Sequence, residues 1–118
     1  MTERTHILVV EDDPLVSEVI AAGLEDRFQT SVVETAADAL QVLDRGDVDL
    51  MLLDCSLPGG LDPALLPAAD RLGAPVILMS GDHTRIEGIS GRQPRPFVLK
   101  PFTLTSLIET VDQVLRAG

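Results

Sequence analysis

Continuous apolar runs alternate along the chain with segments of helical periodicity. Three runs, His6–Val10, Asp49–Leu53 and Pro75–Met79, are almost entirely apolar, which is typical of strands buried on both faces of a parallel sheet. Two further runs, Gln29–Val33 and Phe97–Leu99, are predicted to be edge or near-edge strands. The pattern therefore predicts five strands.

Between the strands, apolar residues recur every three or four positions, as they do on one face of a helix. The first helix is predicted to begin after Asp13, with Pro14 in its first turn, and to run to about Arg27. Two further helices are predicted over residues 36–43, where Gly46 ends the helix, and over residues 104–115. The predicted apolar stripe of the first helix consists of Leu15, Val16, Val19, Ile20 and Leu24.

Two segments give weaker helical signals. Asp62 and Pro63 resemble a helix start, but Pro67 would cost an interior hydrogen bond, so this helix is predicted to start late, near Pro67. The segment from Gly81 to Pro96 holds several glycines and prolines, which leave at most two helical turns. We therefore expect a short or irregular fourth helix, or none, around His83–Ile89.

The alternation of strand and helix predicts an α/β fold with a doubly wound parallel sheet, because the connections are long enough for crossovers and too long for hairpins. The chain of 118 residues has room for one domain, residues 1–118, with no effector domain. Apolar residues make up 45% of the chain and aromatic residues only 3%. The core is therefore predicted to be aliphatic.

Charge and cysteine content exclude several classes of function. The net charge of −10 argues against direct contact with nucleic acid, which requires clustered Lys and Arg. The start of the chain lacks the apolar segment of a signal peptide, and no run approaches the ~18 residues of a membrane span, so a cytoplasmic location is expected. Cys55 is the only cysteine and is predicted to be a small buried hydrophobe. His6 and His83 are predicted to be solvated.

Polar residues follow four of the predicted strands. Glu11 and Asp12 follow the first, Asp54 the third, Ser80 the fourth and Lys100 the fifth. Because the carboxyl ends of parallel strands meet at one edge of the sheet, we expect these groups to form one acidic pocket. Crowded carboxylates repel one another unless a cation joins them. Oxygen ligands without Cys or His at ligand spacing favour Mg²⁺ over Ca²⁺ or Zn²⁺.

This inventory of groups suits phosphoryl transfer. An oxygen of Asp54 can attack phosphorus in line, while Lys100 offsets the charge on the phosphoryl oxygens and the Ser80 hydroxyl donates to one of them. Alternative interpretations remain at this point. Ser80 with the glycine after it is also ordinary turn chemistry, and Asp13 is best explained as a helix cap.

Four motifs occur in the order and spacing of a known family. They are VVEDD at residues 9–13, the strand ending in Asp54, MS at residues 79–80 and KPF at residues 100–102. With them, essentially the whole chain resembles a response-regulator receiver domain of two-component phosphorelays. The resemblance implies a flavodoxin-like strand order 2-1-3-4-5. It also implies Asp54 as the phosphoacceptor and Mg²⁺ bound by Glu11, Asp12, Asp54 and the backbone carbonyl of Ser56.

The resemblance assigns further roles by position. Ser80 would be the switch hydroxyl, Lys100 the phosphate-sensing lysine, and Pro101 the residue whose preceding peptide bond is typically cis. Phe97 falls where the switch aromatic of the family lies and would swing inward with Ser80. The alternative for Phe97 is a core residue at a strand end.

The chain departs from the family pattern in two places. After the acceptor, the segment SLPGGLDP keeps Pro58 and Gly59 but lacks the usual Asp-Gly, which leaves the loop geometry open. The segment of the fourth helix is rich in Gly and Pro and carries Arg85, Arg92 and Arg95. These arginines are the predicted partner surface, with solvated loop charges as the alternative.

The function expected from the resemblance is that of a stand-alone receiver. It would take a phosphoryl group from a histidine kinase or a histidine phosphotransfer protein onto Asp54 and then change its contacts with a downstream protein. It would not be an enzyme beyond its own phosphorylation and dephosphorylation. The alternatives are a receiver excised from a hybrid histidine kinase, a non-phosphorylated module with the same fold, and a phosphohydrolase. Ser56 cannot serve as the proton-transfer group of a phosphohydrolase at neutral pH.

Overall fold

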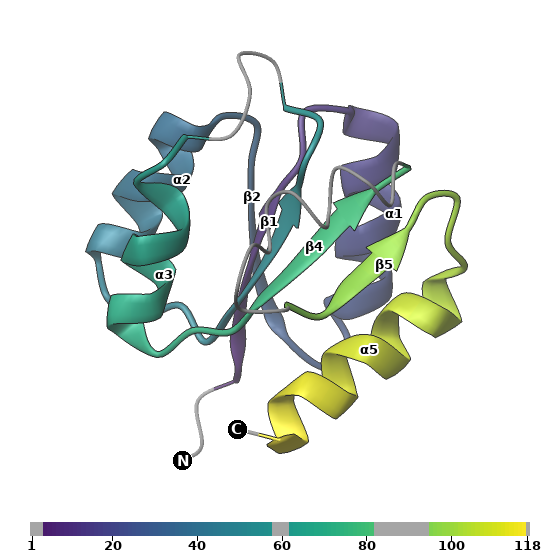
Figure 1. The fold of residues 1–118 in the computed structure, drawn as a ribbon. Coiled ribbons are helices and arrows are strands. Elements are labelled where there is room, and N and C mark those ends of the chain that lie inside the picture. The colour runs from purple at the N-terminus through teal and green to yellow at the C-terminus, as the bar shows by residue number, and fades with distance from the viewer. Residues whose placement is uncertain (1–3, 58–61, 82–94, 118) are drawn as a thin grey trace.

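Five parallel strands form one sheet in the order β2-β1-β3-β4-β5 (Figure 1). The structure is a computed structural model that describes residues 4–57, 62–81 and 95–117. The strand order confirms the predicted doubly wound fold. The strands are β1 (His6–Val10), β2 (Gln29–Val33), β3 (Leu50–Asp54), β4 (Val76–Ser80) and β5 (Phe97–Leu99).

Helices cover both faces of the sheet. Figure 1 shows α2 and α3 on one side and α1 and α5 on the other. The segment predicted to hold a short fourth helix lies outside the described residues. The helices of the described part are α1 (Pro14–Leu24), α2 (Ala36–Asp44), α3 (Leu65–Leu72) and α5 (Leu104–Ala117). None of them combines the length and the hydropathy that a membrane-spanning segment requires.

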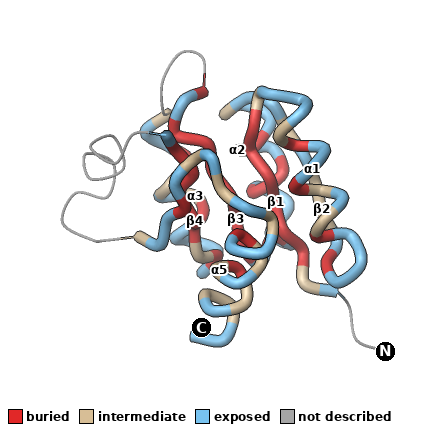
Figure 2. The backbone as a smooth tube through the Cα atoms, turned by 90° about the vertical axis from the view of Figure 1, so that its right-hand side faces the viewer, coloured by how far each residue is buried: buried red, intermediate tan, exposed pale blue. Residues whose placement is uncertain are grey.

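The two faces of the sheet carry two separate hydrophobic cores. Successive residues of β1 alternate between them, because side chains alternate across a strand. Leu8 and Val10 belong to the core under α2 and α3, and Ile7 and Val9 to the core under α1 and α5. The central strands are buried along their whole length, while the outer faces of the helices are exposed (Figure 2). Phe28 is the only Phe, Tyr or Trp side chain among the described buried residues, so the hydrophobic core is aliphatic as predicted.

Local polar contacts fix where the helices begin. Asp13 Oδ1 accepts the Leu15 N–H at 3.0 Å, and Pro14 occupies the first turn of α1. The helix α3 begins at Leu65, two residues earlier than predicted. Pro67 is compatible with that start, because it lies in the first turn, where backbone N–H groups have no partner within the helix.

The helix α1 differs from its prediction in its length and in how much of its apolar stripe is buried. It ends at Leu24 rather than near Arg27, and the N–H groups of Arg27 and Phe28 both donate to the Leu24 carbonyl in the turn that follows. Only part of the predicted stripe is buried: Leu15 and Val19 are 74% and 58% exposed. The stripe was therefore wrongly predicted as a continuous core face.

The prediction that His6 is solvated was also wrong. The side chain is buried, with Nε2 2.7 Å from Ser31 Oγ and Nδ1 3.0 Å from the Asp47 carbonyl oxygen. The imidazole joins β1, the edge strand β2 and the loop before β3 at the end of the sheet opposite the acidic residues. Cys55 is buried, as predicted, and His83 lies outside the described residues.

Candidate functional site

Three carboxylates gather at the carboxyl edge of the sheet. Glu11 and Asp12 directly follow β1, and Asp54 ends the neighbouring strand β3. One oxygen from each lies within 4.8 Å of the others. Glu11 and Asp54 are 0% and 2% exposed, while Asp12 is the more exposed member. The predicted acidic pocket is therefore assembled by two adjacent strands.

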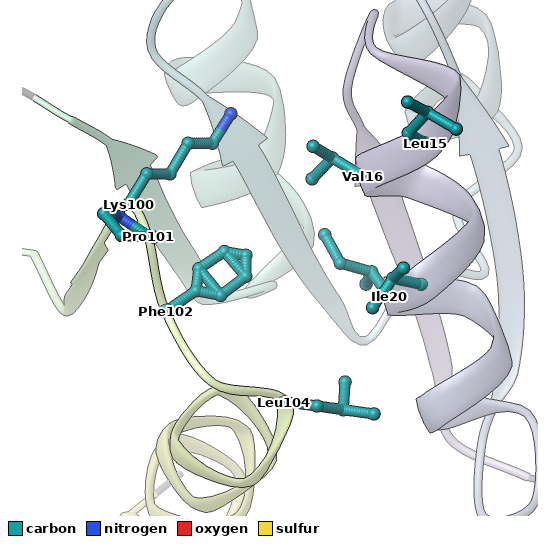
Figure 3. Close-up of a pocket in the computed structure, with 8 residues that line it drawn as sticks. Leu15, Val16, Ile20, Lys100, Pro101, Phe102 and Leu104 are labelled. Carbon is teal, nitrogen blue, oxygen red and sulfur yellow. The ribbon is translucent and has the colours of Figure 1, made fainter.

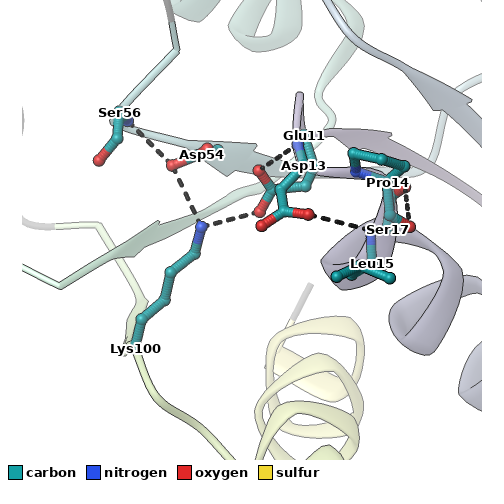
Figure 4. A network of polar contacts seen from close by, with 8 residues as sticks. All are labelled: Glu11, Asp13, Pro14, Leu15, Ser17, Asp54, Ser56 and Lys100. Carbon is teal, nitrogen blue, oxygen red and sulfur yellow. Dashed lines mark hydrogen bonds and ion pairs between the residues drawn. The ribbon is translucent and has the colours of Figure 1, made fainter.

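A lysine from the other side of the pocket balances part of this charge. The Nζ of Lys100 lies 2.8 Å from Glu11 Oε1 and 3.5 Å from Asp54 Oδ1 (Figure 4). Lys100 directly follows β5, and its own N–H donates to the Ser80 carbonyl at 2.8 Å. The pocket thus holds three carboxylates around one described ammonium group.

Burial changes the protonation of this cluster. Burial, reinforced by a hydrogen bond with Asp54, raises the pKa of Glu11 from its ordinary 4.5 to about 7. The hydrogen bonds from Lys100 and from the Asp13 backbone oppose this rise. Burial lowers the pKa of Lys100, but its hydrogen bond to Glu11 and the charge of Asp54 outweigh that effect, so the pKa of Lys100 lies above its ordinary value.

The donor set of the pocket suits a metal ion. Two buried carboxylates and a third at the rim offer oxygen atoms within reach of one another, and none of these groups is a thiolate or an imidazole. Hard cations prefer such oxygen ligands. Three carboxylates gather around the single described ammonium group of Lys100, so a bound cation would offset negative charge that the lysine alone leaves.

Asp54 is held in a fixed orientation. The Ser56 N–H donates to Asp54 Oδ1 at 2.9 Å, and the same oxygen faces Lys100 (Figure 4). Ser80 is buried at the end of β4, the strand that pairs with β3 on the side away from β1. The strand ends thus bring the predicted hydroxyl, lysine and carboxylates to one edge.

Two other predicted residues belong to β5 and to the segment that follows it. The peptide bond between Lys100 and Pro101 is cis. Phe97 begins β5, pairs with Leu78 and is 40% exposed. The alternative interpretation of Phe97 as a core residue is therefore wrong for this structure.

The predicted partner surface is only partly described. Arg85 and Arg92 lie outside the described residues. Arg95 donates to both carboxylate oxygens of Asp70 at 3.2 and 2.9 Å, and its side chain is 16% exposed. Arg95 therefore ties the start of β5 to α3 instead of projecting into solvent.

An apolar groove beside the pocket was missed by the sequence analysis. It lies between α1 and the segment that joins β5 to α5, with a volume of about 470 Å³ (Figure 3). The signal was present in the sequence, because α1 has more apolar positions than a single helix face can bury. The lining residues are Leu15, Val16, Val19 and Ile20 on one wall and Lys100, Pro101, Phe102 and Leu104 on the other.

Comparisons with known proteins agree with this geometry. The family model of the response regulator receiver domain matches residues 7–112. The chain is similar to the DNA-binding response regulator MtrA of Mycolicibacterium smegmatis, with 32% identity over 98% of this chain and 52% of that protein. It is similar to the transcriptional activator protein PfeR of Pseudomonas aeruginosa, with 38% identity over 94% of this chain and 38% of that protein. The solution structure of BeF3-activated SdrG from Pseudomonas melonis Fr1 superposes with a TM-score of 0.79 at 29% identity, over 98% of this chain and 99% of that one.

The chain therefore belongs to the response regulator receiver domains of two-component systems. Domains of this class are signalling modules and not classical enzymes. The chain spans about half the length, or less, of the two curated relatives described above.

Proposed function

We propose that this domain accepts a phosphoryl group from a phosphohistidine onto Asp54, with Mg²⁺, and thereby changes its contacts with a downstream protein. One observation carries the proposal: the buried Asp54 carboxylate, oriented by Ser56 and faced by Lys100, lies beside Glu11. An isolated buried carboxylate would be costly. An arrangement that pairs it with a lysine and two further carboxylates suits an acceptor of phosphoryl groups.

The chain's own residues would perform most of the work. Asp54 supplies the attacking oxygen, and the Ser56 N–H fixes the orientation of its carboxylate. The ammonium of Lys100 lies close enough to offset charge on the transferred group, and Ser80 is placed at the adjacent strand end to donate a hydrogen bond to it.

The proposed metal site consists of Glu11, Asp12 and Asp54, with the backbone carbonyl of Ser56 as a further ligand. Bound there, Mg²⁺ would supply positive charge that orients the phosphoryl oxygens and offsets charge that develops in the transition state. The all-oxygen donor set, with three carboxylates around one described ammonium group, supports this assignment.

We further propose that the phosphodonor docks on the apolar groove next to the pocket. Leu15 and Val19, one helical turn apart on α1, form an exposed apolar ridge that can pack against a helix of another protein. Lys100 lines both the groove and the acidic pocket, so a helix bound there would lie beside Asp54. A histidine kinase or a histidine phosphotransfer protein is the expected donor.

The proposal is tested by intact mass after incubation with Mg²⁺ and a small phosphodonor such as acetyl phosphate. An adduct on the wild type that is absent from Asp54→Asn would support Asp54 as the acceptor. Persistence of acid-labile phosphate on Asp54→Asn would refute that assignment. Absence of an adduct on both proteins would instead favour a non-phosphorylated module with this fold.

A further inference from the structure

We infer that Asp13 is a positioning residue for the proposed metal site, because the residue that caps α1 also holds the carboxylate of Glu11. The inference deepens the proposed function and rests on it, since Glu11 belongs to the metal site proposed there. Asp13 would touch neither the metal ion nor the phosphoryl group. Its role would be to fix the direction in which Glu11 presents its oxygen atoms.

The connection between β1 and α1 leaves little freedom to the residues in it. Residues 11–13 alone lie between the last residue of β1 and the first residue of α1. One end of this connection is fixed to the sheet, because the Glu11 N–H donates to the Val33 carbonyl at 3.0 Å. The position of the other end is therefore set by the contacts that hold Asp13.

Asp13 is held by α1 at two points. Its Oδ1 accepts the Leu15 N–H at 3.0 Å (Figure 4), and its backbone carbonyl accepts the Ser17 N–H at 3.0 Å. Its backbone is extended, with φ −86° and ψ 111°, as is usual for a residue that caps a helix. Of the two contacts, only the one from Oδ1 depends on the side chain. Loss of the carboxylate would therefore loosen the first turn of α1 and, with it, the backbone of residue 13.

The backbone of Asp13 also donates a hydrogen bond to the pocket. The Asp13 N–H lies 3.3 Å from Glu11 Oε2, while the other oxygen of this carboxylate, Oε1, accepts from Lys100 Nζ at 2.8 Å (Figure 4). The plane of the Glu11 carboxylate is thus fixed by two donors, one on each oxygen. Most N–H···O bonds are roughly 2.7–3.2 Å long. The bond from Asp13 is already longer, so a small movement of residue 13 would break it.

A change in the direction of the Glu11 carboxylate would weaken the metal site. Near-ideal octahedral placement of oxygen ligands is required for Mg²⁺, and the partners that orient a metal ligand contribute about 10–100-fold to metal affinity. Without the Asp13 N–H, Glu11 Oε2 would lose this donor, and the carboxylate would be free to turn about its contact with Lys100. We therefore expect Asp13→Ala to weaken Mg²⁺ binding about tenfold.

The cap of α2 provides a matched control. Thr35 Oγ1 accepts the Asp38 N–H at 3.1 Å, so α2 begins with the same kind of side-chain cap as α1. The pocket carboxylates follow β1 and end β3, whereas α2 follows β2. Thr35→Ala should therefore destabilise the domain about as much as Asp13→Ala does, and should leave the Mg²⁺ affinity unchanged.

Two conservative variants separate the cap from the charge of Asp13. Asn and Ser are both good capping residues, and neither carries a negative charge. Asp13→Asn and Asp13→Ser should therefore keep the first turn of α1 and bind Mg²⁺ about as tightly as the wild type.

The test is a titration of the full chain and of each variant with MgCl₂, followed by the backbone amide resonance of Ser56. Urea denaturation in EDTA measures stability separately. We expect Asp13→Ala and Thr35→Ala to lose comparable stability, and only Asp13→Ala to bind Mg²⁺ more weakly. This difference is the result that a merely structural cap would not produce.

Each contrary result overturns a different statement. If Asp13→Ala binds Mg²⁺ as tightly as the wild type, or if Thr35→Ala loses as much affinity, the positioning role is refuted and the proposed function stands. Equal losses of affinity in Asp13→Ala, Asp13→Asn and Asp13→Ser would show that Asp13 acts through its charge, which also overturns the positioning role. If Ser56 of the wild type does not respond to Mg²⁺, the proposed metal site is refuted together with this inference.

Discussion

The buried carboxylate of Glu11 should make the metal-free domain less stable as the pH rises. Its pKa is about 7 in the folded protein and 4.5 in the unfolded chain, so the folded state binds the proton more tightly. The stabilisation from protonated Glu11 is complete below pH 4.5 and is lost as the pH rises through 7. The full effect is about 3 kcal/mol, from about 1.4 kcal/mol for each pH unit between 4.5 and 7.

The part of this stability loss that can be assigned to Glu11 falls at pH values above those at which ordinary carboxylates titrate. Between pH 5.5 and 8, linkage gives a loss of about 2 kcal/mol from Glu11, a large share of the roughly 5–15 kcal/mol that stabilises a small domain. Lys100 does not contribute in this window, because its raised pKa moves its titration to still higher pH. The assay is urea denaturation in EDTA followed by far-UV circular dichroism.

Glu11→Gln isolates the effect, because it keeps the size of the side chain and removes its titration. The unfolding free energy of the variant should decline less steeply with pH than that of the wild type, by about 2 kcal/mol over the window. With a typical urea slope of about 1–3 kcal/mol per molar, this corresponds to a relative shift of roughly 1 M in midpoint. Parallel pH profiles of the two proteins would show that the reasoning about Glu11 is wrong.

Three further substitutions test the packing and the caps, each by urea denaturation. Gly23→Ala should destabilise the domain by about 1 kcal/mol, because the overlap with Leu104 outweighs the gain in helix propensity. The control variant is Gly81→Ala, whose Cβ would meet only the Lys100 carbonyl at 3.9 Å. Equal losses of stability in the two variants would contradict the overlap assigned to Gly23. His6→Ala should lower the unfolding free energy by about 1–3 kcal/mol, because it removes two buried hydrogen bonds. The backbone amides of β2 should then exchange hydrogen faster, and an unchanged exchange rate would contradict the proposed role of His6 in holding β2. Asp13→Ala should cost about 1 kcal/mol through loss of the α1 cap, and no loss would show that the cap contributes little.

The acidic pocket could be predicted because it depends on local features of the sequence. Apolar runs mark the parallel strands, and the polar residue after each run must lie at the carboxyl edge of the sheet. Glu11, Asp54 and Lys100 meet in the structure for this reason, although 89 positions separate the first from the last. The prediction of the pocket did not require the order of the strands, because all of these strands end at the same edge of the sheet.

The features that the sequence did not reveal depend on tertiary geometry. The exposure of Leu15 and Val19 depends on how much of α1 is covered by α5, and α5 approaches α1 closely at Gly23, near the end of α1. Periodicity finds the apolar face of a helix but not how much of it the neighbours cover. The burial of His6 depends likewise on Ser31 and on the Asp47 carbonyl, contributed by segments distant in sequence.

The instability predicted for the metal-free pocket follows from the same arrangement that serves its proposed chemistry. Carboxylates that already had a full complement of cations would gain little from Mg²⁺, whereas Glu11 and Asp54 share one lysine and lie in a buried site. Mg²⁺ should therefore stabilise the domain more at pH 8 than at pH 5.5, because at low pH it must displace the proton on Glu11. If Mg²⁺ stabilised wild type and Glu11→Gln equally at both pH values, the ion would be binding somewhere other than this pocket.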